Sequence, residues 1–135
     1  MNTICSNKTF TCFNLIETHS SATLGASVVR RFTGGVAVYH DLGNINYAIV
    51  AKKKIGSVEE IYGYLINGAL NALKQLGLSP WLENINDVVV NNRKVSVAAA
   101  TFHGDTIFLH GALLVSTDLK KLSRVLKISR KKLLD

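Results

Sequence analysis

The chain contains little cysteine and little proline, with two cysteines and one proline in 135 residues. A single proline, no compositionally biased tract, an apolar fraction of 47% and 19% charged residues favour an ordered globular protein over a disordered one. Cys5 and Cys12 match neither a Cys-x-x-Cys redox pair nor a zinc knuckle, so we expect free thiols rather than a disulfide framework.

Long hydrophobic runs are also missing. No segment is apolar enough to span a bilayer, and the first residues are polar rather than those of a signal peptide. We therefore expect a cytoplasmic protein. A length of 135 residues fits a single domain, residues 1–135, with one hydrophobic core.

Acidic residues are scarce: 9 Asp and Glu face 16 Lys and Arg, for a net charge of +7. This charge suits an acidic partner, which could be nucleic acid, an anionic membrane surface or an acidic protein. The basic clusters at 52–54 and 130–132 lack interleaved aromatic residues, which favours solvated faces over a nucleic-acid platform. Nucleic-acid binding is the weakest of the functions considered.

Segments rich in β-branched residues predict an antiparallel meander in the first half of the chain, at residues 27–31, 36–40 and 46–51. The Thr33-Gly34-Gly35 turn would join the first two strands and lie beside the loop 41–44. Before residue 27 the pattern predicts only a short strand at 10–16.

A capping box, with Ser57 at the N-cap and Glu60 three residues later, predicts a helix that closes near Gly77 and Pro80. Its apolar stripe comprises Ile61, Leu65, Ala69, Ala72, Leu73 and Leu76. We interpret Tyr62 and Tyr64 as packing residues.

A hairpin across Asn91-Asn92 is predicted to join strands 87–90 and 93–101, because asparagine tolerates left-handed turns. A strand at 106–115 follows, and then a helix at 118–127, capped by Thr117 or Asp118. Strands and helices mix without a strict βαβ rhythm, which favours an α+β fold.

The stretch from Arg30 to Tyr47 is the strongest candidate for a binding site. Its paired glycines allow a ligand to approach the backbone, and its paired arginines supply planar donors for phosphate or carboxylate. A phosphorylated or adenylated small molecule would fit. Taken alone, such pairs are more often hairpin turns and solvated strand ends. The stretch reads Arg30-Arg31-Phe32-Thr33-Gly34-Gly35-Val36-Ala37-Val38-Tyr39-His40-Asp41-Leu42-Gly43-Asn44-Ile45-Asn46-Tyr47.

The order of these residues resembles the motif Arg-Arg-x-Ser/Thr-Gly-Gly-Gly-x-Val-Tyr/Phe-His-Asp-Leu-Gly-Asn of lipoate–protein ligases, with Val36 in place of the third glycine. A second block, 86–98, resembles the family's Asn-Asp-Ile/Val segment, with Lys94 at its essential lysine and Val97 where the family has glycine. A third, 107–119, is similar to the family's His-Gly/Ala-x-Leu-Leu block at His110-Gly111. The blocks are closest to the archaeal branch.

This resemblance implies an α+β fold with a mixed, mainly antiparallel sheet packed by helices, namely a biotinyl/lipoyl-ligase-like catalytic domain shortened at both ends. Self-association or a partner chain would then complete the fold. It also implies two reactions: ATP activates lipoate to lipoyl-AMP, and a lysine of a lipoyl domain then accepts the lipoyl group.

The resemblance implies Lys94 as the catalytic residue, through electrostatic stabilisation. The residues implied to bind ATP or lipoyl-AMP are Arg31, Thr33, Gly34, Gly35, Val36, Ala37, Val38, Tyr39, Asp41 and Lys94. Supporting residues are Arg30, His40, Asn44, Asp87 and His110. Two of these roles have ordinary alternatives: Lys94 as an exposed strand lysine, and Asp41 with Asn44 as caps of their own turn rather than ligands of Mg²⁺ or ribose.

The implied substrates are ATP with Mg²⁺, and lipoate. The implied partners are the lipoyl domain of 2-oxoacid dehydrogenase complexes or the glycine cleavage H protein. A protein-held metal is not expected, because the four histidines show no ligand spacing. Cysteine-mediated acyl transfer is disfavoured, because both cysteines precede the arginine motif. The alternative function is a non-catalytic relative that binds a lipoyl group, its adenylate or the carrier protein.

Overall fold

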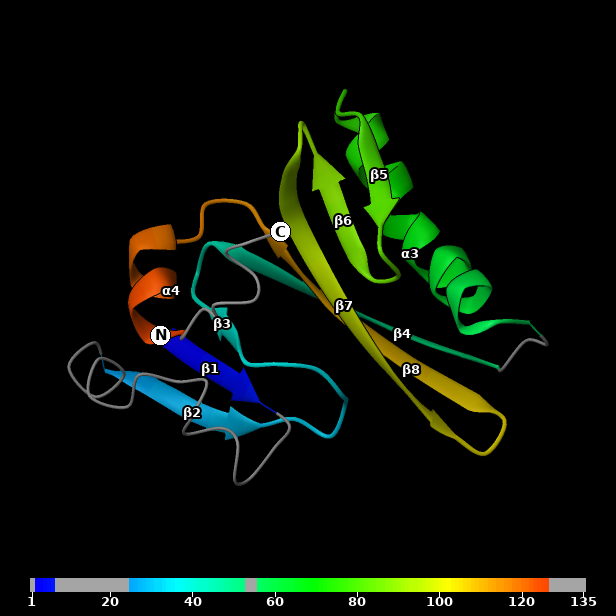
Figure 1. Ribbon diagram of the computed structural model, residues 1–135, viewed down its shortest axis with the longest axis horizontal. Coiled ribbons are helices and arrows are strands. Elements are labelled where there is room, and N and C mark those ends of the chain that lie inside the picture. Colours follow the sequence, from blue (N-terminus) through cyan, green and yellow to red (C-terminus); the bar gives the residue numbers. More distant parts are fainter. Residues whose placement is uncertain (1, 7–24, 53–55, 127–135) are drawn as a thin grey trace. The chain divides into compact units, whose positions relative to one another are not determined.

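The computed structural model describes residues 2–6, 25–52 and 56–126 (Figure 1). The chain divides into two compact units, of which unit 1 comprises Met1–Asn44 with Val115–Asp135, and unit 2 comprises Ile45–Leu114. Each unit has its own sheet and its own buried cluster, so the expectation of one hydrophobic core is wrong. Within the described ranges, no helix has the length and apolarity needed to cross a membrane.

The sheet of unit 1 has the strand order β2-β1-β3. Strand β1 (Asn2–Ser6) pairs in parallel with β2 (Ala26–Arg30) and antiparallel with β3 (Val38–His40). The predicted meander is therefore wrong, because the N-terminal strand lies between its first two strands and its third strand belongs to unit 2. The strand predicted at 10–16 lies outside the described residues.

Helix α4 (Leu119–Val125) supplies the core of unit 1. It begins at the N-cap Asp118, whose side chain accepts a hydrogen bond from the Lys121 backbone N–H, which satisfies one of the unpaired donors of the first turn. Val125 is fully buried and packs with Tyr39 and Ala37. The prediction of Asp118 as one of two possible caps is confirmed.

The sheet of unit 2 has five strands in the order β4-β8-β7-β6-β5. Strands β5 to β8 pair antiparallel with one another. At the β6–β7 turn, Asn91 and Asn92 have φ of 50° and 58°, which confirms the predicted hairpin. The sequence missed β5, because Pro80 was interpreted only as a helix stop. The strands are β4 (Asn44–Lys52), β5 (Pro80–Glu83), β6 (Asp87–Val90), β7 (Arg93–His103) and β8 (Thr106–Leu114).

Helix α3 (Val58–Gln75) begins with the predicted capping box: Ser57 Oγ accepts from the Glu60 N–H at 3.2 Å, and Glu60 Oε2 accepts from the Ser57 N–H at 2.9 Å. Beyond its end, Gly77 has φ of +80°. The predicted stripe gains Ile66, which is fully buried. It loses Ala72, which is exposed, and Leu76, which lies at the C-cap and is 75% exposed.

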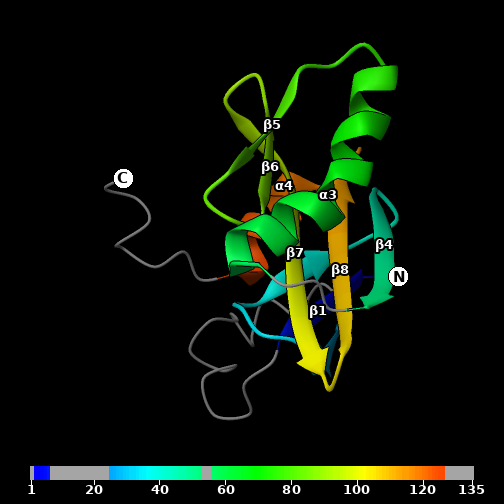
Figure 2. The ribbon, with the colours of Figure 1, turned by 90° about the vertical axis from the view of Figure 1, so that its right-hand side faces the viewer.

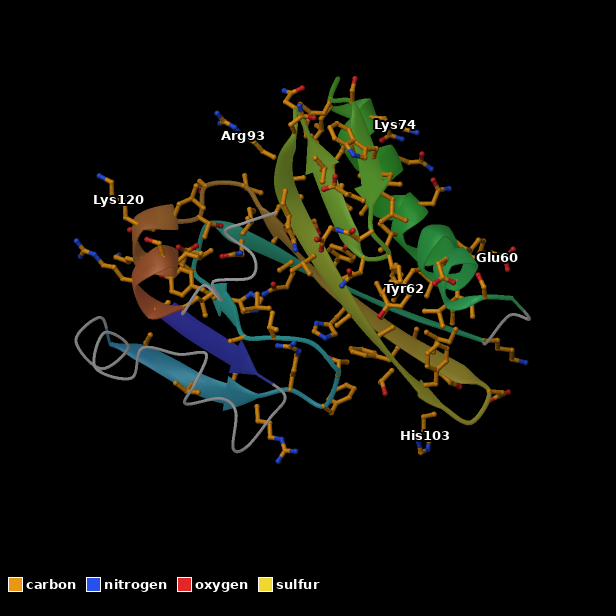
Figure 3. The ribbon with its side chains drawn as sticks, in the orientation of Figure 1. Glu60, Tyr62, Lys74, Arg93, His103 and Lys120 are labelled. Atoms are coloured by element: carbon orange, nitrogen blue, oxygen red, sulfur yellow. The ribbon has the colours of Figure 1, made fainter. Side chains whose placement is uncertain are left out.

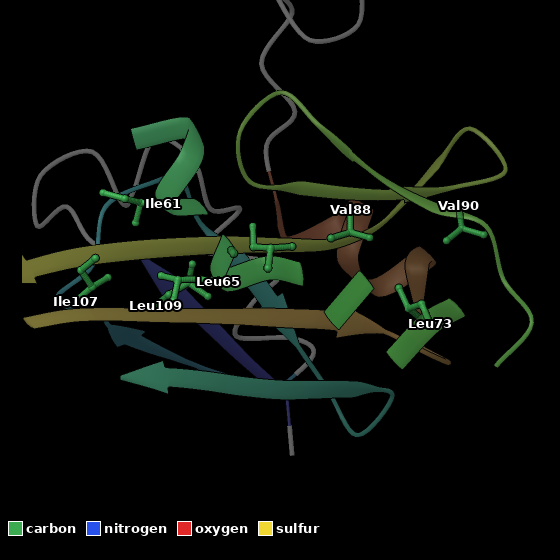
Figure 4. Packing of buried hydrophobic residues seen from close by; sticks show 9 residues of the cluster. Ile61, Leu65, Leu73, Val88, Val90, Ile107 and Leu109 are labelled. Carbon is green, nitrogen blue, oxygen red and sulfur yellow. The ribbon is translucent and has the colours of Figure 1, made fainter. Parts of the chain in front are cut away.

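Helix α3 covers one face of the unit 2 sheet (Figure 2). Each fully buried apolar side chain stabilises the fold by about 1.5–3 kcal/mol, so the side chains of this layer stabilise unit 2. Figure 4 shows Ile61, Leu65 and Leu73 of the helix with their neighbours on the strands. Those neighbours are Val88, Val90, Ile107 and Leu109.

Strand β7 continues beyond its last pair with β6, and two polar residues bind its backbone there. Asn86 exchanges two bonds with Ala98: its carbonyl oxygen accepts from the Ala98 N–H at 2.9 Å and its Nδ2 donates to the Ala98 oxygen at 2.7 Å. The Tyr62 hydroxyl accepts from the Ala100 N–H at 2.8 Å (Figure 3). Tyr62 is thus a packing residue, as expected, whereas Tyr64, two positions further round the helix, is 59% exposed.

Candidate functional site

The loop between β2 and β3 is organised by one arginine. Arg31 Nε and Nη2 donate to the Gly34 carbonyl oxygen at 3.2 and 2.8 Å, and Nη2 also donates to the Val36 carbonyl oxygen at 2.7 Å. Gly35 has φ of +104°, and a Cβ there would lie 2.8 Å from Arg31 Nη2. Glycine is therefore favoured at position 35 by the backbone conformation, and a side chain there would also displace the guanidinium from its present position.

Val36 fits this loop without a left-handed backbone, because the positive φ falls on Gly35. Its side chain is 54% exposed. The side chains of Thr33, Ala37 and Tyr39 are buried instead. Contacts from these three residues to a ligand would therefore be made by their backbone groups.

Asp41 braces the loop that follows β3. Its Oδ1 accepts from the Gly43 N–H at 2.8 Å and its Oδ2 accepts from the Asp118 N–H at 2.9 Å. Asn44 Oδ1 accepts from the Asp41 N–H at 2.8 Å. Because both oxygens of Asp41 bind backbone donors, the geometry supports the turn-capping role of Asp41 and Asn44 that the sequence left open.

The carbonyl oxygen of Gly43 also holds this loop in place, because it accepts several hydrogen bonds from the segment before α4. It accepts from the N–H groups of Val115 and Ser116, both at 3.0 Å, and from Thr117 Oγ1 at 3.3 Å. A Cβ on Gly43 would overlap Ser116 and lie 2.5 Å from the Thr117 nitrogen. This position therefore tolerates only glycine, for reasons of space.

Two electrostatic effects accompany these contacts. Burial, and then the negative charges of Asp41 and Asp118, raise the pKa of the Tyr39 hydroxyl above 10.0, so Tyr39 stays neutral at physiological pH. The backbone N–H of Lys121 is the largest influence on Asp118 and holds the pKa of that carboxyl below 3.8. Asp118 is thus the charged N-cap of α4, which suits the helix dipole.

In unit 2, Lys94 forms an ion pair with Asp87. Lys94 Nζ lies 2.7 Å from Asp87 Oδ1, and the side chains are 44% and 17% exposed. Lys94 lies opposite Val89 in the β6–β7 pair, and Asp87 lies two residues before Val89 on the same strand. Both therefore belong to the sheet face that points away from α3.

His110 belongs to the same face, because its partner Ala99 follows Val97 by two residues and Val97 pairs with Asp87. The His110 ring stacks on Phe108, with ring centroids 5.7 Å apart. The structure thus brings the three unit 2 residues that the sequence selected, Lys94, Asp87 and His110, to one face of one sheet.

Gly111, the residue after His110, lies on the opposite face of the sheet, which α3 covers. A Cβ there would overlap the ring and hydroxyl of Tyr47. The Tyr47 hydroxyl lies 3.4 Å from Ser96 Oγ, and burial raises the pKa of Tyr47 above 10.0. Gly111 is therefore a packing position, since its missing side chain leaves room for Tyr47.

The candidate residues fall into two sets. Those from Arg30 to Asn44 belong to unit 1, and Lys94, Asp87 and His110 belong to unit 2. Sequence reasoning missed the role of Gly43 and the bond from the Asp118 N–H to Asp41. That bond joins residues 77 positions apart, and such distant contacts leave no local pattern in the sequence. In the part of the chain that the structure describes, no three His, Cys, Asp or Glu side chains gather as a metal site.

Comparison with known proteins places these features in a family context. Residues 9–135 match the family model of the lipoyl protein ligase A/B catalytic domain. A putative lipoate-protein ligase A of Aeropyrum pernix is 40% identical over 101 residues, which cover 75% of this chain and 38% of that protein. Lipoate-protein ligase A subunit 1 of Thermoplasma acidophilum is 33% identical, and the match covers 82% of this chain and 46% of that protein. The chain spans less than half the length of these relatives.

Solved structures are similar over nearly the whole chain. A bi-partite lipoate protein ligase of T. acidophilum, studied with its E2 lipoyl domain, superimposes with a TM-score of 0.86 at 29% identity, covering 99% of this chain and 53% of that one. A putative ligase of that organism with bound lipoic acid gives a TM-score of 0.85 at 27% identity over 96% of this chain and 58% of the other. A lipoate-protein ligase A bound with ATP gives 0.86 at 27% identity, with coverages of 95% and 56%.

Proposed function

Because the chain belongs to the lipoyl protein ligase A/B catalytic domain family, we propose that it activates lipoate with ATP and transfers the lipoyl group to a carrier lysine. In the first step a lipoate carboxylate oxygen attacks the α-phosphorus of ATP, and pyrophosphate leaves. In the second step the lysine amine attacks the acyl carbon of lipoyl-AMP, and AMP leaves. The first step brings two anions together, so fixed positive charge is the main requirement of the site.

The observation that carries this proposal is the state of Lys94. Its ammonium group is held by Asp87 at 2.7 Å, yet its side chain remains 44% exposed. An ammonium has three N–H donors, so Lys94 can bind a substrate oxygen without leaving its partner. We assign it to the lipoate carboxylate and the α-phosphate, where it stabilises the charge that develops during attack.

We assign nucleotide binding to the loop and strand of unit 1. A Cβ at Gly34 would meet no atom within 4 Å, so this part of the loop is open to a ligand. Arg31 supplies positive charge, and residues 33–39 supply backbone donors and acceptors. Arg30, His40, Asp41 and Asn44 are proposed to hold the segment in shape. The family model spans both units, which supports the expectation of a single domain.

Magnesium enters this proposal with ATP. Each carboxylate oxygen of Asp41 already accepts one backbone N–H, and Asp87 Oδ1 is paired with Lys94. Mg²⁺ in nucleotide sites is held largely by phosphates and water, with one or two carboxylates. The described residues therefore fit a metal carried by the substrate rather than one caged by the protein.

The test is lipoate-dependent release of pyrophosphate from ATP. Wild type should release pyrophosphate, whereas Lys94→Ala should reduce the rate by about a hundredfold, which is typical for loss of one electrostatic contact in a transition state. Lys74→Ala is the matched control, because Lys74 is an exposed helix lysine in the same unit (Figure 3). No release above the Lys94→Ala rate, with candidate partner chains present, refutes the proposal.

The proposed carrier is the lipoyl domain of a 2-oxoacid dehydrogenase complex or the glycine cleavage H protein. The related T. acidophilum ligase is bi-partite and was studied with an E2 lipoyl domain, which supports both a lipoyl-domain acceptor and a second chain. Exposed apolar residues on β2 of unit 1 support a partner surface, with Val28 and Val29 at 52% and 45% exposure. Assays should therefore include a second ligase chain.

A non-catalytic relative is the second candidate. Val36 and Val97 both stand where the family motif has glycine, and branched side chains at such positions reduce the space for a ligand. A protein of this kind would bind lipoate, lipoyl-AMP or the carrier protein without releasing pyrophosphate. Calorimetric binding of lipoyl-AMP by a chain that fails the release assay would establish this function.

A further inference from the structure

The pairing of β6 with β7 contains one extra residue. Asp87 pairs with Val97 and Val88 with Ser96, but the next pairs are Val89 with Lys94 and Val90 with Arg93. Val95 therefore has no partner on β6, which makes it the extra residue of a β-bulge.

The bulge decides which face of the sheet carries Lys94. Side chains alternate along a strand, so unbroken alternation from Ser96 would place Lys94 on the face covered by α3. Val88 and Val90 pack in that helix-covered core, and Val95 packs against it as well. The extra residue reverses the alternation, and Lys94 comes to lie opposite Val89, on the face of Asp87.

On that face Asp87 is within reach of Lys94. It lies two residues from Val89 on the same strand, which is the diagonal relation that long side chains can span across an antiparallel pair. A second ion pair, Lys121 with Asp118, is longer at 3.5 Å and exposed on both sides, at 43% and 41%. By contrast, Asp87 is only 17% exposed, so its charge is less screened by water.

We propose that Asp87 is the positioning residue of Lys94, and that the bulge at Val95 is the backbone feature that brings the two together. A lysine side chain is flexible and its ammonium is strongly hydrated, so an unpaired Lys94 would occupy many positions. Pairing with a half-buried carboxylate restricts it to one. This inference rests on the proposed function of Lys94 for its catalytic consequence, whereas the restriction itself is a property of the chain.

The decisive variant is Asp87→Asn, which keeps the volume of the side chain and removes its charge. Asp87→Glu is the rescue variant, because it restores the charge on a stem one methylene longer. Asp105→Asn is the matched control, since Asp105 is an exposed carboxylate in the same unit. Urea unfolding of each variant shows whether the fold is intact.

Two readouts separate this inference from the proposed function. The first is the side-chain NMR order parameter of Lys94, with exposed Lys74 as an internal reference. Asp87→Asn should lower the Lys94 value to that of Lys74, and Asp87→Glu should restore part of it. An unchanged Lys94 value in Asp87→Asn overturns the inference, whether or not the protein releases pyrophosphate.

The second readout is pyrophosphate release by the full chain. Asp87→Asn should lower kcat about tenfold to a hundredfold, as expected for a misplaced catalytic group, with partial recovery in Asp87→Glu. In the Lys94→Ala background the same change should have no further effect, because both residues act through one ammonium group. Equal losses in the two backgrounds overturn the positioning role. An inactive wild type would refute the proposed function alone, while the NMR result still decides the inference.

Discussion

Replacement of Gly43 by alanine should destabilise the protein for a purely steric reason. Gly43 does not have a positive φ, so alanine brings no conformational penalty at this position. Its methyl group would instead overlap Ser116 and lie 2.5 Å from the nitrogen of Thr117. These are backbone atoms, which cannot rotate away as a flexible side chain can.

The magnitude follows from two contributions. Forcing a methyl group into a filled space costs about 1–3 kcal/mol. Moving the segment away would also stretch the three hydrogen bonds that the Gly43 oxygen accepts, and each such bond contributes about 0.5–1.5 kcal/mol. We expect Gly43→Ala to lower the free energy of unfolding by about 3 kcal/mol, with partial loss of these bonds.

The assay is urea unfolding followed by circular dichroism, analysed at constant m-value. Gly34→Ala is the matched control, because a Cβ there meets no atom within 4 Å and its φ is not positive. That variant should stay within about 0.5 kcal/mol of wild type. If Gly43→Ala also stays within that range, the close approach of the two segments does not exist in solution.

Three further predictions concern other positions. Gly111→Ala should lower stability in urea by about 2 kcal/mol, because its methyl group meets the ring of Tyr47; a second change, Tyr47→Ala, that fails to relieve this loss would contradict the packing. Burial raises the pKa of Tyr47 above 10.0, so the folded state favours the neutral hydroxyl. The stability that this preference contributes is fully present below pH 10.0 and declines as the pH rises above it. The urea midpoint should therefore decline less in alkaline buffers for Tyr47→Phe than for wild type. Arg31→Lys should weaken ATP binding in calorimetry, because lysine lacks the fork that reaches the Gly34 and Val36 oxygens, and unchanged affinity would remove the loop from the nucleotide site.

Elements with strong local signals could be predicted from the sequence. The capping box at Ser57 and Glu60 fixed the start of α3, and the two asparagines at 91 and 92 fixed the β6–β7 turn, because each signal acts within a few residues. The strand order of unit 1 could not be predicted. The first strand pairs with residues 26–30 and 38–40, and the sequence of a five-residue segment does not indicate such distant partners.

The candidate site shows the same division. The resemblance of whole motifs selected Lys94 and Asp87, but a strict alternation of side chains would have put Lys94 on the other face. Only the register shift after Val88 reveals their contact. Likewise, the sequence left two roles open for Asp41, and the bond to Asp118, 77 positions away, favours the structural one.

The hydroxyl of Tyr62 has a consequence for solubility. Strand β7 continues past the end of β6, and an unpaired strand edge invites another chain to add a strand and start an aggregate. At this edge the N–H and the oxygen of Ala98 are bound by Asn86, and the N–H of Ala100 is bound by the Tyr62 hydroxyl of α3. Asn86 and Tyr62 thus occupy these hydrogen-bonding groups of the strand edge. Tyr62→Phe would leave the Ala100 N–H available for pairing with another chain, while the helix remains packed on the sheet.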